Sequence, residues 1–203
     1  KTALEANPKQ GQFWISYIDA LIKTTQLEAA REVLQQGKKN GLSEETINVL
    51  EEQMSFSGPL HNQVNALIDL YNAGQMVATE KACLELLQTY PQALVVINIL
   101  GAAFKAQGKL AEAVASYDQA IELKPDYINA YYNRGITLQE LGKLAEAVAS
   151  YDQAIQFKPD YAEAYYNRGI TLQEMGQLAE AVSSYDQAIE LKPNYAEAHN
   201  GRA

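Results

Sequence analysis

The stretch AYYNRGITLQELGKLAEAVASYDQAI at 130–155 returns as AYYNRGITLQEMGQLAEAVSSYDQAI at 164–189, and this repetition decides the fold. When 128–161 is aligned with 162–195, 26 of 34 positions are identical. The same interval of 34 separates prolines, glycines and alanines: Pro91, Pro125, Pro159 and Pro193; Gly101, Gly135 and Gly169; Ala113, Ala147 and Ala181. A unit copied at a fixed interval is typical of repeat proteins, whereas an enzyme site is assembled once from unlike pieces. The repetition therefore favours an extended surface over a reactive centre.

Each unit predicts two amphipathic helices. Apolar residues after Gly176 recur at spacings of three and four: Leu178, Ala181, Val182, Tyr185, Ala188 and Ile189. Tyr165, Gly169 and Leu172 show the same spacing before it, which is the period of a helix with one apolar face. Gly176 marks the end of the first helix, and KPN at 192–194 ends the second, because proline disfavours helix in the residue before it. The unit is therefore a helical hairpin.

This pattern closely resembles the tetratricopeptide repeat. The residues that carry the resemblance are Tyr165, Gly169, Leu172, Ala181, Tyr185, Ala188 and Pro193, in the order that the family signature requires. The signature is also complete in 128–161 and nearly complete in 94–127. The resemblance implies an all-α fold of tandem helix-turn-helix repeats, wound into a right-handed superhelical solenoid whose first helices line the concave face.

The organisation of the chain follows from where the signature fades. We expect a degenerate unit with an extra helix over 1–54, a linker over 55–62, and a repeat array over 63–203. The array contains a degenerate unit at 60–93, full units at 94–127, 128–161 and 162–195, and a partial unit at 196–203. The chain begins at Lys1 and stops inside a repeat, so we expect it to be a fragment of a longer protein.

The charge and hydropathy of the sequence argue against some classes of binding partner. The formal net charge is −9 and the 16 basic residues are scattered, which argues against nucleic acid as a partner. No apolar run reaches the length needed to span a bilayer, so we expect no membrane insertion. Cys83 lies in an apolar setting and cannot form an internal disulfide. A lone thiol favours a reducing compartment such as the cytoplasm without fixing the location.

The sequence contains no pattern that indicates catalysis, a cofactor or a metal. It lacks phosphate-binding glycine loops, zinc-protease and hydrolase motifs. His61 and His199 share no spacing typical of metal ligands. Glu112, Glu146 and Glu180 recur with the repeat, and repetition separates them instead of bringing them together for acid catalysis. We therefore expect no catalytic residue, no cofactor and no metal.

The resemblance implies a peptide-binding groove on the first helices. Its positions correspond here to Asn98, Lys105, Tyr132, Asn133, Ile136, Gln139, Glu140, Tyr166, Asn167, Ile170, Gln173 and Glu174. Amides can pair with both donors and acceptors of an extended backbone, and tyrosines give contact area at low entropy cost. The carboxylate clamp of chaperone cochaperones is not expected, because its asparagine slot holds Ala102, Ile136 or Ile170. Asn65, Asn133 and Asn167 instead match the asparagine ladder of O-linked N-acetylglucosamine transferases, which Ile99 interrupts.

Two rows of residues that recur with the repeat, one of arginines and one of tyrosines, each have two interpretations. Arg134, Arg168 and Arg202 either reach a nearby acid while their stems cover apolar surface, or form a row that clamps a ligand. Tyr117, Tyr151 and Tyr185 either pack between the paired helices or form a ladder on which a ligand stacks. We favour the packing interpretation for both rows.

The sequence therefore predicts a non-catalytic scaffold that binds a protein or peptide segment in the groove. The alternative is a substrate-recognition arm of a larger bacterial glycosyltransferase or sulfotransferase, since such enzymes carry similar repeats ahead of their catalytic domains. Self-association is also expected, because the last full unit leaves an apolar face at Leu178, Val182 and Ile189 that 196–203 covers only in part.

Overall fold

The computed structural model describes residues 11–23, 27–56 and 59–202, and within these ranges it is helical with no strand. The chain divides into two compact units between Ala66 and Leu67. The helices in chain order are α2 (Gly11–Lys23), α3 (Leu27–Lys39), α4 (Glu44–Phe56), α5 (Pro59–Asn72), α6 (Met76–Thr89), α7 (Leu94–Ala106), α8 (Leu110–Leu123), α9 (Ile128–Glu140), α10 (Leu144–Phe157), α11 (Ala162–Glu174), α12 (Leu178–Leu191) and α13 (Ala196–Arg202).

The first compact unit contains α2, α3 and α4, and each of these helices packs against the other two. Its core is apolar and consists of Ile18, Leu21, Ala30, Leu34, Ile47, Leu50 and Met54. Helix α4 is the extra helix expected within 1–54, although it continues to Phe56, and Ser43 precedes it with its Oγ accepting the backbone N–H of Thr46 at 3.3 Å. This side chain satisfies one of the donors that a helix leaves open at its first turn.

The predicted linker over 55–62 is too long. Helix α4 extends to Phe56 and α5 already begins at Pro59, while residues 57 and 58 lie outside the described ranges. Pro59 is read from the sequence as part of a break, but proline is favoured at the first position of a helix, where its missing N–H costs no bond. The position of a proline relative to the helix start therefore decides whether it breaks or begins the element.

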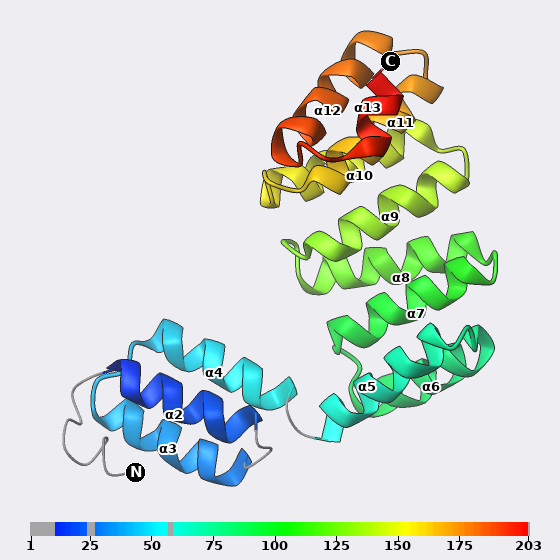
Figure 1. Ribbon diagram of the computed structural model, residues 1–203. Helices are drawn as coiled ribbons and strands as arrows, with labels where there is room; N and C mark the ends of the chain where they lie inside the picture. The colour runs from blue at the N-terminus through cyan, green and yellow to red at the C-terminus, as the bar shows by residue number, and fades with distance from the viewer. Residues whose placement is uncertain (1–10, 24–26, 57–58, 203) are drawn as a thin grey trace. The chain divides into compact units, whose positions relative to one another are not determined.

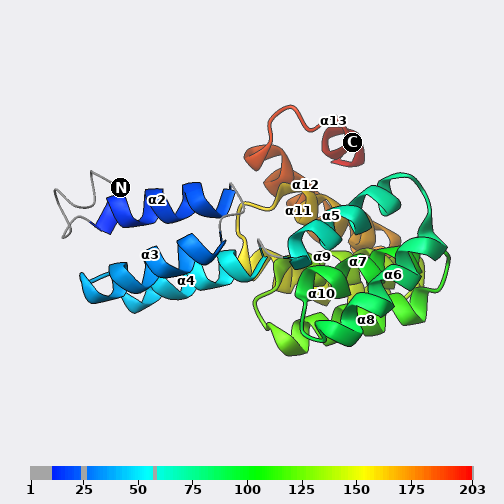
Figure 2. The same ribbon diagram turned by 90° about the horizontal axis from the view of Figure 1, so that it is seen from below.

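The second compact unit is a stack of helical hairpins, which Figure 1 shows from α7 at mid-height to α13 at the C-terminus. Each helix from α6 to α13 packs against the next one in the chain, and α7, α9, α11 and α13 also contact their neighbours in that series. Figure 2 shows the same hairpins from below. The tandem all-α solenoid predicted from the sequence is confirmed.

Glycines close the turns within the hairpins. Gly74, Gly108, Gly142 and Gly176 recur at the interval of 34 and have positive φ angles of 73 to 75°. A side chain at such an angle is strained, so glycine is the residue that fits. The helices on either side pack around buried tyrosines, because Tyr117, Tyr151 and Tyr185 are at most 1% exposed. The interpretation of this tyrosine row as core is confirmed.

Candidate binding face of the first helices

The first helices of consecutive repeats are connected by polar side chains. Four side-chain pairs connect α7 to α9 and α9 to α11, and every pair joins residues 35 apart: Asn98–Asn133, Lys105–Glu140, Tyr132–Asn167 and Gln139–Glu174. We call the twelve residues expected to line the groove the first-helix face. The structure brings eight of them into these direct contacts between neighbouring repeats.

The amides of this face donate along the stack. Asn133 Nδ2 donates to Asn98 Oδ1 at 3.1 Å, and Asn167 Nδ2 donates to the hydroxyl of Tyr132 at 2.9 Å. Among the described residues, no hydrogen bond to the Oδ1 atoms of Asn133 and Asn167 is recorded. Both side chains are only partly buried. Each asparagine therefore contacts the preceding repeat through its amide nitrogen, and within the described residues its amide oxygen has no such partner.

The end of the face near the glycine turns carries the charge. Lys105 Nζ lies 3.0 Å from Glu140 Oε1, whereas Glu174 Oε1 accepts a hydrogen bond from Gln139 Nε2 at 2.8 Å. Gln139 and Gln173 make the same contact within their own hairpins, since the Oε1 of Gln139 accepts from the hydroxyl of Tyr151 at 3.4 Å and that of Gln173 from the hydroxyl of Tyr185 at 2.9 Å. The contacts of Glu140 and Glu174 are thus equivalent in consecutive repeats, but only Glu140 has a cation as its partner.

The opposite end of the face is aromatic. The ring centroids of Tyr132 and Tyr161 are 4.8 Å apart, and those of Tyr166 and Tyr195 are 5.0 Å apart. Burial, followed by the nearby Tyr132, raises the pKa of Tyr161 to about 12. Tyr161 and Tyr195 are missing from the predicted face, although their recurrence at the interval of 34 could have indicated them. Each aromatic pair joins a first helix to the loop that precedes the next one.

Lysines cover these loop tyrosines. Lys158 Nζ lies 4.7 Å from the ring centroid of Tyr161, and Lys192 Nζ lies 4.6 Å from that of Tyr195. Lys192 Nζ is also 3.5 Å from a carboxylate oxygen of Glu163. A cation over an aromatic ring is attracted by the electrons of its face. The aromatic end of the first-helix face is thus bordered by positive charge.

Two predicted residues contribute more to the core than to the polar face. Ile136 is half-buried and packs against the cluster around Leu138 and Tyr151, and Ile170 does the same against Leu172 and Tyr185. These isoleucines therefore join the first-helix face to the core of their hairpins.

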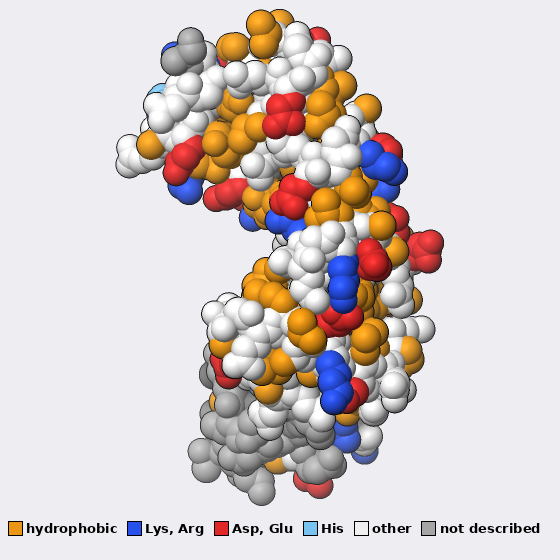
Figure 3. All heavy atoms as spheres, turned by 90° about the vertical axis from the view of Figure 1, so that its right-hand side faces the viewer, with side chains coloured by type: hydrophobic (Ala, Val, Ile, Leu, Met, Phe, Trp, Pro, Cys, Tyr) orange, Lys and Arg blue, Asp and Glu red, His pale blue; other side chains and the backbone are white. Residues whose placement is uncertain are grey.

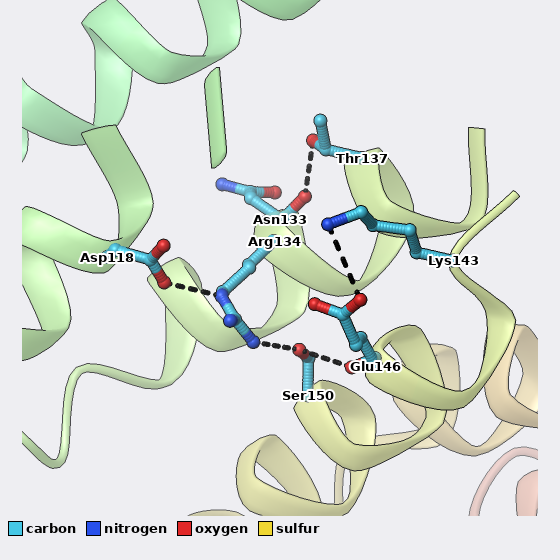
Figure 4. Close-up of polar contacts among 7 residues, drawn as sticks. All are labelled: Asp118, Asn133, Arg134, Thr137, Lys143, Glu146 and Ser150. Atoms are coloured by element: carbon cyan, nitrogen blue, oxygen red, sulfur yellow. Dashed lines mark hydrogen bonds and ion pairs between the residues drawn. The ribbon is translucent and has the colours of Figure 1, made fainter. Parts of the chain in front are cut away.

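The arginine row lies between second helices. Figure 4 shows Arg134 reaching from α9 to Asp118 of α8 and to Ser150 of α10. Its Nε lies 2.6 Å from Asp118 Oδ1 and its Nη1 donates to Ser150 Oγ at 2.8 Å. The contacts return one repeat later at Arg168, and Arg202 lies 3.0 Å from Asp186. The interpretation that each arginine reaches a nearby acid is confirmed.

Charges of opposite sign lie together elsewhere on the surface. The face in Figure 3 shows basic side chains next to acidic ones instead of a field of one sign. One such contact joins repeats, because Glu80 accepts from Lys109 Nζ at 2.7 Å and from Gln107 Nε2 at 2.8 Å. The hydrogen bond from Lys109, followed by the one from Gln107, lowers the pKa of Glu80. These contacts hold consecutive hairpins together.

Reactive groups are sparse in the described residues. They contain no cluster of three or more His, Cys, Asp or Glu side chains placed to hold a metal ion. Burial raises the pKa of the Cys83 thiol to about 12, so it is not a thiolate at neutral pH. Helices both long and apolar enough to cross a membrane are absent from these same ranges.

Paired helices that repeat at an interval of 34 and share one polar face define a helical-hairpin repeat protein. Family models agree with this class: a TPR repeat model matches 101–142 and 137–176, and a tetratricopeptide repeat model matches 162–195. The chain therefore belongs to the tetratricopeptide repeat family, as its sequence signature predicts. A comparison with curated protein sequences found no match.

Solved structures support the same fold. A crystal structure of MamA has a TM-score of 0.63 and 23% identity, covering 66% of this chain and 78% of that one. The first TPR of Spaghetti (RPAP3), bound to the HSP90 peptide SRMEEVD, has a TM-score of 0.53 and 30% identity, covering 55% of this chain and 88% of that one. YrrB, described as a TPR protein with an unusual peptide-binding site, has a TM-score of 0.61 and 18% identity over 99% of this chain and 96% of that one.

Proposed function

We propose that this protein is a non-catalytic interaction scaffold that binds an extended segment of another protein along the first-helix face. The observation that carries the proposal is the pairing of Asn133 and Asn167 with the preceding repeat through their donors only. Their amide oxygens are at equivalent positions in consecutive repeats. Such oxygens can accept backbone N–H groups of an extended chain at regular steps.

The rest of the face suits this ligand. Tyr132 and Tyr166 offer partly buried rings beside the asparagines, and tyrosine gives contact area with few rotatable bonds. The family resemblance adds support, since the TPR of Spaghetti is solved with a bound peptide and is 30% identical over the matched region.

The peptide of that complex, SRMEEVD, is rich in acidic residues and is not the expected ligand class. The slot in which the family's clamp carries asparagine holds Ala102, Ile136 or Ile170 here. Ile136 and Ile170 pack against the core clusters of their own hairpins, so this slot offers no amide donor to a terminal carboxylate. We propose that recognition depends on the backbone and side chains within a segment.

The test compares two variants that lose the same hydrogen bond. Asn167→Ala removes the amide from the face, whereas Tyr132→Phe removes only the hydroxyl that this amide contacts at 2.9 Å. Each variant should lose about 0.5–1.5 kcal/mol of unfolding free energy, as expected for one hydrogen bond. Binding is measured by calorimetry with the best ligands from a positional-scanning library of short peptides.

We expect Asn167→Ala to weaken peptide binding about three- to tenfold, and Tyr132→Phe to leave it unchanged or stronger. Asn133→Ala should behave like Asn167→Ala. Equal affinity of Asn167→Ala and the unmodified protein would show that the asparagines serve packing alone. A library that yields no ligand would reject the proposed function itself.

A further inference from the structure

The charged end of the first-helix face differs between consecutive repeats by one residue. Glu140 and Glu174 are equivalent, 34 residues apart, and each contacts the side chain 35 residues earlier in the preceding first helix. For Glu140 that side chain is Lys105, and for Glu174 it is Gln139. The protein itself thus shows a lysine held by this carboxylate in one repeat, and a neutral amide in its place in the next.

Glu174 is the carboxylate without a cation. Its recorded contact within the described part of the chain is the hydrogen bond from Gln139 Nε2, and no ion pair is recorded for it there. Glu174 is exposed, so a partner can reach it. A positive charge placed at Glu174 would be favoured by this carboxylate, which no ion pair within the described residues neutralises.

We propose that Glu174, held by Gln139, receives a lysine or arginine of the bound segment, in the arrangement that Lys105 and Glu140 adopt one repeat earlier. This inference rests on the proposed function and specifies the class of its ligand, a segment with a basic residue at one fixed position. The other polar groups of the face then align the backbone of the bound segment. The ion pair with Glu174 fixes the register of that segment along the first helices.

The repeat supplies its own variants for the test. Gln139→Lys copies the slot of Lys105, so an internal ion pair would occupy Glu174, and the variant loses the 3.4 Å hydrogen bond that Gln139 Oε1 accepts from the hydroxyl of Tyr151. Lys105→Gln copies the slot of Gln139 and leaves Glu140 open to a ligand. Glu174→Gln removes the charge, and Glu180→Gln is the matched control, because Glu180 is an exposed glutamate at the start of a second helix, away from the first-helix face.

The probes are peptides selected from the positional-scanning library, each prepared with its lysine free or acetylated. The unmodified protein should prefer the free lysine by about two- to fivefold, the range of an exposed ion pair. Gln139→Lys and Glu174→Gln should abolish this preference, Glu180→Gln should keep it, and Lys105→Gln should increase binding of peptides with a second basic residue. Thermal unfolding checks that all four variants are folded.

The outcomes separate the two proposals. Selected peptides that bind with no preference for a basic residue, or that bind Gln139→Lys and the unmodified protein equally, would overturn the basic-residue inference and leave the scaffold function standing. Loss of the lysine preference in Glu180→Gln to the same extent as in Glu174→Gln would also overturn it, because net charge would then explain the effect. A library without any ligand would remove both proposals.

Discussion

Gly135 lies directly against the ring of Tyr151, since a Cβ atom placed on Gly135 would be 2.6 Å from Cε1 of that ring. The same contact joins Gly101 to Tyr117 and Gly169 to Tyr185. Each pair lies inside one hairpin, so the glycine lets the two helices approach across a buried tyrosine.

We predict that Gly135→Ala lowers the free energy of unfolding by about 1–2 kcal/mol. Overpacking a core costs about 1–3 kcal/mol, and the higher helix propensity of alanine returns up to about 1 kcal/mol. Chemical denaturation measures the change. In a Tyr151→Leu background the ring is gone, so the same substitution should be neutral or stabilising. An equal loss in both backgrounds would contradict this explanation.

The arginine row predicts a stability effect without a binding effect. Arg168→Met breaks the contacts with Asp152 and Ser184, while Ser184 keeps its bond to the Glu180 backbone carbonyl. Because the Arg168 and Asp152 side chains are 26% and 48% exposed, we expect a loss of only about 0.5–1 kcal/mol, smaller at high salt. Denaturation at two ionic strengths tests this. Weakened peptide binding with unchanged stability would support the ligand-clamp interpretation instead.

The raised tyrosine pKa values predict instability in alkali. Burial, followed by nearby groups, raises the pKa of Tyr161 and of Tyr195 from 10.0 to about 12. The folded protein therefore holds these protons more tightly than the unfolded chain does. Their contribution to stability is complete below about pH 10 and disappears as the pH rises toward 12.

Denaturation across this range, read together with tyrosinate absorbance, measures the effect. The Tyr161→Phe and Tyr195→Phe variants serve as controls and should lose stability less steeply between pH 10 and 12. An unfolding free energy that stays level over this range would contradict the prediction.

The last full hairpin predicts self-association of the 203-residue chain. Val114 and Val148 pack against side chains of the next repeat, whereas Leu178 and Val182 are 62% and 41% exposed. We expect a second copy of the chain to cover this apolar face, so that light scattering shows a mass that rises with concentration. Replacing Leu178 and Val182 with glutamine should restore a monomer. A constant monomeric mass of the unmodified chain would contradict the prediction.

The repeat interval made the hairpins, their turns and their tyrosine core predictable, because these contacts lie within one unit and reappear in each copy. The sequence predicted that each arginine reaches an acid, but it did not identify which acid. Asp118 and Ser150 flank Arg134 at 16 residues on either side, in different hairpins. Ser150 lies in the same hairpin as Arg134, whereas the angle between hairpins selects Asp118, and the sequence of one unit does not specify that angle.

The same limit applies to the first-helix face. Its residues could be assigned from the family resemblance, but the offset of 35 that pairs Asn98 with Asn133 depends on how one hairpin stacks on the next. Tyr161 was missed for a related reason, since it lies in a loop and joins the face only through its contact with Tyr132. The ambiguity at Pro59 is local instead, because proline is common both in breaks between helices and at the first position of a helix.

The constant offsets have a consequence for how such a chain can change in length. Between full units, each arginine contacts an acid 16 residues earlier, and the partners of the polar pairs on the first-helix face lie 35 residues apart. Duplication of one whole unit of DNA coding sequence therefore supplies both members of each new contact at once, and its loss removes both. Length, and with it the span of ligand that the protein can cover, can vary in steps of one unit without any compensating substitution.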